Sequence, residues 1–510
     1  MKNHLSRRGL FQGGSLLAAS GFLPAQAATT RKGGVNIYES IGVRPVVNCR
    51  GTFTIISGSQ SLPEVKEAML EASKHYVQLD ELMNAVGARL AELTKAEWGI
   101  VTNGCAAALT HATSACIAGA DPEKMQRLPK LAGLKNEVIM PKYARNVYDH
   151  AVRMTGVDIV EVDSAEELEG AFNARTAMIL ILSCPAAEKG PLSIESVAAV
   201  AKRHGVPLLV DAAAETLTIP NIHLQHGATM VAYSGGKCLR GPQAAGLLLG
   251  RKDLLQAAWL NSAPHHAFGR SLKVGKEEIM GMLAAVEMWT KRDHKAEWRQ
   301  WEAWLGHISD RVTKVPGVTT EILQPEDLSN HAPQLRIKWD GTKVGITGRE
   351  AEKILLDGTP RIVVGGSGGN SLTVMPYMMM PEDHKIAADA LYAVLSKPPR
   401  VEAPKPPAGE PVNLAGKWQV HVEYSLGSAE HTLTIDQAGE KISGSHASEM
   451  FTGQLRGSVQ AAQVQFHSSH RIQGTAIGYD FTGTADSGGM QGTVAMGEYG
   501  QARWTARRAV

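Results

Sequence analysis

The sequence predicts an α/β protein with a three-layer large domain, a smaller α+β region and a final all-β region. Three observations support this architecture. Short β-branched apolar runs alternate with helical segments over residues 99–249, which is typical of a mostly parallel sheet covered on both faces. Residues 398–411 are rich in proline, as in a semi-rigid linker. Residues 412–510 show short alternating segments with frequent glycines, which favours a barrel or sandwich.

The bulk composition excludes several classes of protein. A chain of 510 residues is too long for one hydrophobic core, so we expect several domains. The 52 basic and 50 acidic residues leave a formal net charge of +2. This balance gives no excess of positive charge of the kind that binds nucleic acid or an anionic membrane.

The N-terminus has the composition of an export signal. Arg7 and Arg8 are followed by an uncharged apolar stretch and then by Ala25, Gln26 and Ala27, which form an A-x-A cleavage site. The paired arginines before Leu-Phe resemble a twin-arginine signal, and a general secretory signal is the alternative. No stretch reaches the about 20 apolar residues needed to cross a bilayer. We therefore expect a periplasmic or secreted protein without a membrane span.

The cysteines support a protein that folds in a reducing compartment. There are five, with neither a CxxC motif nor metal-ligand spacing, at positions 49, 105, 116, 184 and 238. A disulfide-stabilised secreted chain would carry more cysteines in a shorter length. Free thiols fit a twin-arginine substrate, which folds before export.

Seven apolar runs are the predicted strands of the large domain: residues 99–102, 137–140, 158–162, 177–182, 206–210, 230–233 and 245–249. Ligands of such sheets bind in the loops that follow the strand ends. The tryptophans that follow, at positions 289, 298, 301 and 304, are interpreted as core packing. His467 and His470 lie close together in the all-β region, but no third ligand accompanies them, so we predict no metal site there.

These patterns predict the following domain boundaries: a signal peptide at 1–27, an N-terminal arm at 28–60, a large domain at 61–260, a small domain at 261–397, a linker at 398–411 and a β domain at 412–510. Gly416 and Trp418 at the start of the β domain give a weak match to the first strand of lipocalin-like barrels.

Three strand ends carry the residues that suggest chemistry. Lys237 follows the 230–233 run among small residues and is a candidate amine nucleophile. Asp211 ends the 206–210 run and is followed by three alanines, which leave space for a flat ring. A helix N-cap is the alternative role for this carboxylate. Thr102 to Ala107 form a strand-to-helix turn whose backbone N–H groups can bind a phosphate.

This order of phosphate turn, aspartate and lysine resembles the fold-type I (aspartate-aminotransferase-like) enzymes that use pyridoxal 5′-phosphate (PLP). The segment S-G-G-K-x-L-R-G-P-Q around Lys237, with D-A-A-A upstream, is similar to the selenocysteine-synthase-like group. That group includes seryl-tRNA selenium transferases and D-glucosaminate-6-phosphate ammonia-lyases. The likeness extends over residues 37–395, is nearer to the ammonia-lyases, and covers neither the signal nor the β domain.

The resemblance implies roles for individual residues. Lys237 would form a Schiff base with PLP and later move the Cα proton, and Asp211 would pair with the pyridinium nitrogen. The cofactor-binding set would be Gly104, Cys105, Ala106, His150, Asp211, Ala213, Ser234 and Lys237, with Gly104, Cys105, Ala106 and Ser234 around the phosphate and the His150 ring stacked on PLP. His150 has an alternative as an ordinary helix-face residue. Cys105 stands where a smaller residue is expected, either as a tolerated side chain or as a reactive thiol.

Substrate contacts are assigned to Arg361, Arg270 and Asn48. The planar guanidinium of Arg361 suits a bidentate grip on a carboxylate. Arg270 and Lys273 could instead face a partner subunit, because fold-type I sites form at dimer interfaces. We therefore expect a homodimer or a higher homo-oligomer.

The leading hypothesis is an exported PLP-dependent lyase or transferase that acts on a small amino acid or amino-sugar acid, with elimination favoured. The alternatives are selenocysteine synthesis, aminotransferase or racemase chemistry, and a non-catalytic envelope binding protein. The near-neutral charge argues against a tRNA substrate.

Overall fold

The computed structural model describes residues 36–366, 368–398 and 409–509. The expected signal peptide lies outside these residues, as does most of the expected linker. By compactness the chain separates into Met1–Val46 and Val47–Val510. In the first unit the described residues contain one short 3-10 helix, η1 (Glu39–Ile41). No helix within the described ranges is long and apolar enough to span a membrane.

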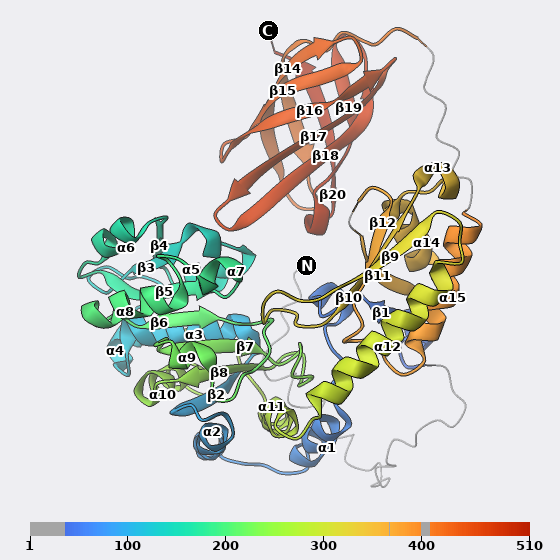
Figure 1. Ribbon diagram of the computed structural model, residues 1–510. Coiled ribbons are helices and arrows are strands. Elements are labelled where there is room, and N and C mark those ends of the chain that lie inside the picture. Colours follow the sequence, from blue (N-terminus) through green and yellow to red (C-terminus); the bar gives the residue numbers. More distant parts are fainter. Residues whose placement is uncertain (1–35, 367, 399–408, 510) are drawn as a thin grey trace, which may run out of the picture. The chain divides into compact units, whose positions relative to one another are not determined.

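The large sheet has seven strands in the order β2-β8-β7-β6-β5-β3-β4 (Figure 1). They are β2 (Trp98–Thr102), β3 (Glu137–Pro141), β4 (Asp158–Val162), β5 (Thr176–Leu182), β6 (Leu208–Asp211), β7 (Met230–Ser234) and β8 (Gly246–Gly250). The pairs from β4 to β7 are parallel, whereas β8 runs antiparallel to both of its neighbours. The expectation of a mostly parallel sheet is confirmed.

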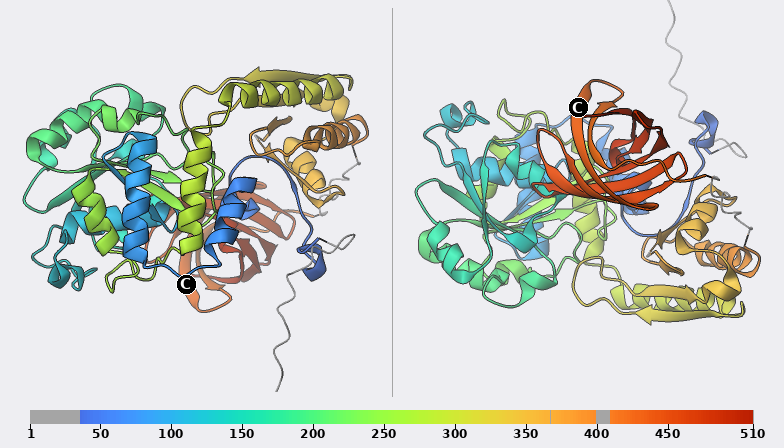
Figure 2. Two further views of the ribbon diagram at one scale, coloured as in Figure 1. Left: turned by 90° about the horizontal axis from the view of Figure 1, so that it is seen from below. Right: turned by 90° about the horizontal axis from the view of Figure 1, so that it is seen from above.

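Helices cover this sheet on both faces (Figure 1; Figure 2). The helices of this part of the chain are α1 (Pro63–Ala72), α2 (Leu79–Thr94), α3 (Gly104–Ala118), α4 (Pro122–Met125), α5 (His150–Arg153), α6 (Ala165–Ala171), α7 (Pro185–Glu188), α8 (Ile194–His204), α9 (Ile222–Gln225), α10 (Lys252–Leu260) and α11 (Lys276–Trp289), with the 3-10 turns η2 (Thr54–Ile56), η3 (Lys142–Ala144) and η4 (Val147–Asp149). Helix α3 is central because its small side chains allow burial all round: residues 107–115 are all buried.

A second sheet has five strands in the order β1-β11-β12-β10-β9. Its elements are β1 (Val47–Cys49), β9 (Val318–Leu323), β10 (Gln334–Trp339), β11 (Ile362–Gly366) and β12 (Ser371–Val374), with α12 (His294–Val312), α13 (Gly341–Val344), α14 (Gly348–Asp357) and α15 (Asp383–Ser396). Strand β1 comes from the segment expected to be an arm, yet it pairs in parallel with β11, so that Val47 lies opposite Ile362. The small α+β region is therefore formed by residues that precede the large sheet in the sequence together with residues that follow it.

The last region is a closed eight-stranded antiparallel barrel, which confirms the expected all-β fold. Its strands are β13 (Gly416–Glu423), β14 (Ser428–Ala438), β15 (Lys441–Ala447), β16 (Thr452–Gln460), β17 (Gln463–Ile472), β18 (Thr475–Ala485), β19 (Gly489–Ala495) and β20 (Gln501–Arg508), with η5 (Gly497–Tyr499) before the last strand. Pairing of β13 with β20 closes the barrel, which leaves no edge strand. Inward Trp418, Val420 and Val422 alternate with exposed residues on β13, as period-2 patterning requires.

Candidate active site

The register of the large sheet brings the three predicted strand ends to one edge. Asp211 at the end of β6 lies opposite Ala232 of β7. Ser234, the last residue of β7, pairs with Gly246 of β8, and Gly246 in turn pairs with Thr102 of β2. Because β8 is antiparallel, its first residue lies among the last residues of its neighbours. The aspartate, the lysine loop and the start of α3 therefore share this edge.

The turn from β2 into α3 has the geometry of an anion cup. Gly104, the first residue of α3, has a φ of +76°, and a Cβ built there would meet open space. A Cβ on Gly246 would lie 2.4 Å from the Gly104 backbone, so β8 can pack this closely against the start of α3 only because residue 246 is glycine. No side chain caps α3, and Ala106 in its first turn is exposed. Free backbone N–H groups there can bind a phosphate.

Asp211 is a buried carboxylate that lacks a full counter-charge. It is 3% exposed, and its Oδ1 accepts a hydrogen bond from the Ala213 N–H at 3.1 Å. Burial raises the pKa of Asp211, while the Ala213 hydrogen bond and the charge of Lys237 oppose this rise. A protonated ring nitrogen at this carboxylate would supply the missing positive charge.

Cys105 lies against the same aspartate rather than against solvent. Its thiol donates to Asp211 Oδ1 at a sulfur–oxygen distance of 3.6 Å. Burial, together with the Asp211 charge, raises the pKa of the Cys105 thiol well above its usual range. The structure therefore favours a packed small residue over a reactive thiol.

Lys237 is half-buried in the loop after β7. The loop can form only with glycines: a Cβ on Gly235 would lie 2.8 Å from the Ala245 carbonyl oxygen, and one on Gly236 would lie 2.0 Å from Gln243 Oε1. The Ser234 N–H donates to the Ala213 carbonyl at 3.2 Å, which joins this loop to the segment after Asp211.

The remaining predicted site residues, His150, Asn48, Arg361 and Arg270, lie on other segments and make no hydrogen bond to Asp211 or Lys237 among the described residues. His150 is exposed at the start of α5, a short helix that packs on α3 through a hydrogen bond from Thr110 Oγ1 to the Ala151 carbonyl. The Asn48 side chain is engaged in its own turn, accepting from the Gly51 N–H and donating to the Gly51 carbonyl. Arg361 is half-buried and donates from Nε to the Leu356 carbonyl, and Arg270 is exposed.

A buried polar network next to this edge was not predicted. Glu215 is 4% exposed, accepts a hydrogen bond from Ser183 Oγ and lies 2.5 Å from His223 Nε2. The Cys238 thiol, adjacent to Lys237, donates to the Glu215 carbonyl at 3.0 Å. The Ser183 N–H donates to the Asp211 carbonyl at 2.9 Å. The network thus ties the segments that carry Asp211 and Lys237. The only sequence signal was a glutamate shortly after the strand-end aspartate.

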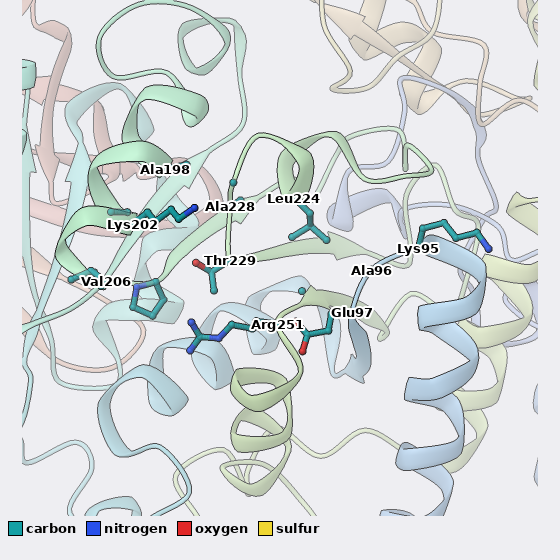
Figure 3. A pocket seen from close by; sticks show the side chains of 15 residues that line it. Lys95, Ala96, Glu97, Ala198, Lys202, Val206, Leu224, Ala228, Thr229 and Arg251 are labelled. Carbon is teal, nitrogen blue, oxygen red and sulfur yellow. The ribbon is translucent and has the colours of Figure 1, made fainter.

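Two recesses lie near the sheet. The larger, of about 500 Å³, is at the opposite edge, where β6 and β7 begin, and its lining includes Lys95, Glu97, Lys202, Thr229 and Arg251 (Figure 3). The smaller, of about 70 Å³, adjoins Cys238 and is lined by aromatic side chains that include Trp298, Trp301 and Tyr377. Three of the four tryptophans interpreted as core packing, Trp289, Trp298 and Trp301, thus border a recess beside the lysine loop, whereas Trp304 packs on the core of the small region.

Comparisons with known proteins show the family to which this chain belongs. The aminotransferase class-V family matches residues 71–270. D-glucosaminate-6-phosphate ammonia lyase of Salmonella typhimurium is 31% identical over 63% of this chain and 87% of its own length. The 5′-C-glycyluridine monooxygenase-decarboxylase of a Streptomyces species is 30% identical over 57% of this chain and 74% of its own. A solved structure of D-glucosaminate-6-phosphate ammonia-lyase superposes with a TM-score of 0.64 at 28% identity, covering 71% of this chain and 98% of that one.

Proposed function

The chain belongs to the fold-type I PLP enzymes of the ammonia-lyase and selenocysteine-synthase group, and from this membership we propose that it eliminates a Cβ substituent from a small amino acid or amino-sugar acid. It is a PLP-dependent lyase or transferase. The observation that carries the proposal is the placement of Asp211, Lys237 and the open N-terminus of α3 at one edge of the large sheet.

The residues at this edge fit PLP. Asp211 is buried without a full counter-charge, which suits a protonated ring nitrogen. The open space at Gly104 and the uncapped start of α3 suit the phosphate. Gly104, Cys105, Ala106 and Ser234 would surround the phosphate, and Lys237 would hold the aldehyde carbon. The cofactor supplies an electron sink at the substrate Cα.

The residues of the chain supply the remaining steps. The Lys237 amine would accept the Cα proton and return a proton later. The negative charge of Asp211 would stabilise positive charge on the ring nitrogen of the cofactor. We assign Arg361 to the substrate carboxylate. In this role its Nη1 and Nη2 groups would bind the carboxylate while its Nε–H donates to the Leu356 carbonyl.

The test is a panel of D- and L-amino acids and sugar amino acids added to the purified protein. We expect one class of substrate to change the visible absorption of bound PLP and to release ammonia together with a 2-oxo acid. Ammonia-free racemisation, or amino-group transfer to an added 2-oxo acid, would overturn the elimination while leaving the cofactor assignment intact. The formal charge of +2 gives no support to a tRNA substrate.

Export through the twin-arginine route is part of this proposal. Its support is the sequence of residues 6–27, with Arg7 and Arg8 before the apolar stretch. Replacing both arginines by lysine should leave the full-length precursor in the cytoplasm. Continued export in a strain without the twin-arginine translocase would contradict this route and indicate the general secretory pathway.

We also propose a homodimer. Several large apolar side chains near the start of the described chain are exposed, among them Ile55 at 90% and Tyr76 at 101%. A second copy would cover such a surface. Sedimentation should give twice the chain mass, and Ile55→Asp with Tyr76→Asp should shift it towards the monomer. A monomeric wild-type protein at micromolar concentration would contradict the proposal.

A further inference from the structure

The interior of the barrel is divided into two unlike halves. One end is filled by large buried rings: Trp418, Phe466, Phe481 and Trp504 are each no more than 1% exposed. The inward positions nearer the other end carry imidazoles and a hydroxyl. We call these residues, His431, His446, Ser468 and His470, the imidazole cluster.

The contacts within the cluster leave polar atoms unpaired. His431 Nδ1 and His446 Nε2 lie 2.8 Å apart, and the two residues are 3% and 0% exposed. One proton is shared between these nitrogens, so one imidazole donates and the other accepts. Among the described residues, His446 Nδ1, Ser468 Oγ and both nitrogens of His470 have no hydrogen-bond partner. Unpaired buried polar atoms are rare in folded proteins, which points to an occupant.

The cluster lies towards the end of the barrel at which β14 begins and β15 and β17 end. Tyr424, His470 and Ile477 are half-buried near strand ends, whereas His431, His446 and Ser468 are buried further in. Aromatic rings pack on the cluster: the Phe451 and His470 planes lie 6° apart, and those of His470 and Tyr479 lie 19° apart. Phe451 also lies edge-on to His431 and His446, with ring centroids 6.1 and 5.0 Å apart, so a flat acid would reach these imidazoles by displacing the Phe451 ring.

The inward titratable side chains around the imidazole cluster are basic or phenolic. Burial lowers the pKa of all three imidazoles, to about 3 for His446. Burial raises the pKa of Tyr479 to about 12, and Tyr424 is the other phenol beside it. Between Gly416 and Arg508 the acidic side chains are all exposed, and Glu430 and Asp480 pair with the outward His421 and His467. The described inward-facing side chains of the barrel therefore include no carboxylate, and the imidazoles are the groups among them that can take up a proton.

We propose that the imidazole cluster binds one small planar carboxylic acid, which enters as the carboxylate together with one proton from solution. The carboxylate oxygens accept hydrogen bonds from the unpaired N–H and O–H groups, and the proton converts the two neutral imidazoles of His431 and His446 into one imidazolium hydrogen-bonded to one imidazole. The added negative charge favours this protonated form. The buried charges balance, and no covalent bond changes.

Benzoate is a suitable probe, used with the full-length PLP-loaded protein. Calorimetry at pH 6, 7 and 8 in buffers of different ionisation enthalpy should show one site per chain, uptake of about one proton, and binding about tenfold tighter for each unit of falling pH. The visible absorption of PLP should stay unchanged. Absence of binding at pH 6, or binding without proton uptake, would overturn the proposal.

Matched variants separate the cluster from other histidines and from the cofactor site. His446→Ala and His470→Ala should each weaken benzoate binding at least tenfold, whereas His467→Ala on the outer face of the same strand β17 should not. His470→Ala removes no protein hydrogen bond, so it keeps the test valid where His446→Ala fails to fold. Benzoate binding that alters PLP absorption and survives both inward variants would place the acid at the cofactor site and exclude the cluster.

Discussion

The large sheet and the barrel both gather polar groups at one end of their strands, but they do so in different ways. In the large sheet, β6 and β7 are parallel, so the ends of both strands meet and Asp211 lies beside the loop of Lys237. In the barrel the strands alternate in direction. His431 comes from near the start of β14, and His446 comes from the end of β15. Site residues at the ends of parallel strands can therefore be recognised from the sequence, whereas the sequence does not show which inward residues of an antiparallel barrel meet.

The two regions also treat buried charge differently. Burial raises the pKa of Asp211 and the charge of Lys237 opposes this rise, so a positive ring nitrogen would complete the neutralisation of this carboxylate. The imidazole cluster has no acidic partner among the described inward residues and stays neutral. The edge of the large sheet thus contains a buried negative charge at Asp211, whereas the imidazole cluster is neutral until it takes up a proton with the proposed acid.

The largest expected effect is that of Lys237→Ala. Without the amine, the visible absorption of lysine-bound PLP should disappear, and turnover should fall by at least about 10²–10⁴-fold, the range for loss of an acid–base group. Lys202→Ala, at the opposite edge of the same sheet, is the matched control and should leave both unchanged. Retained lysine-bound absorption in the Lys237→Ala variant would assign the chemistry to another amine.

Asp211→Asn should retain the shape of the cofactor edge and remove its charge. We expect turnover to fall by about 10²–10³-fold, comparable to removing a preorganised electrostatic group, with PLP still bound. The pH dependence of the PLP absorption spectrum should change as well. No helix begins at Asp211, so the N-cap alternative is wrong, and an unaltered spectrum and rate would show that Asp211 serves only the turn through its hydrogen bond from the Ala213 N–H. Asp253→Asn, an exposed change, is the control.

Trp418→Ala tests whether the barrel is energetically separate from the cofactor edge. Trp418 is fully buried and donates from its indole N–H to the Leu414 carbonyl at 2.8 Å. Its truncation should destabilise the barrel by about 3–5 kcal/mol in denaturant unfolding. The PLP absorption should be unaffected, and its loss would show that the barrel supports the site. Lys417→Ala, on the outer face, should change little.

Acid should weaken the barrel before it weakens the cofactor edge. Because burial holds the pKa of His446 at about 3 in the folded state, the unfolded state binds more protons below about pH 6.5. The stability from this residue is present above that pH and is lost as the pH falls, by roughly 1–2 kcal/mol between pH 7.5 and 5. Tryptophan fluorescence during urea unfolding measures it. His446→Leu should flatten this dependence, and an equal slope in that variant would contradict the assignment.

The smallest expected effect is that of Cys105→Ala. Since burial raises the pKa of this thiol, it should react slowly with iodoacetamide. Turnover of the variant should stay within about threefold of wild type, because the substitution removes only a weak thiol hydrogen bond to Asp211. Rapid alkylation that abolishes turnover would restore the reactive-thiol alternative.

Local patterns were sufficient for the large sheet. Its strands are continuous apolar runs, so the β6 run could be recognised and Asp211 identified at its end. The antiparallel direction of β8 was not predictable, because an apolar run carries no sign of direction. Neither was the pairing of β1 with β11, which joins Val47 to Ile362 across the whole large domain.

The sequence by itself determined the α/β architecture, the barrel and the pairing of Lys237 with Asp211 as candidate residues, since strand periodicity and strand-end chemistry are local properties. Only the tertiary structure decided that Glu215 contacts Ser183 and His223, and that His431 contacts His446. These contacts depend on register and on the inward or outward direction of side chains between separate elements, and those arise only when the sheet and the barrel close.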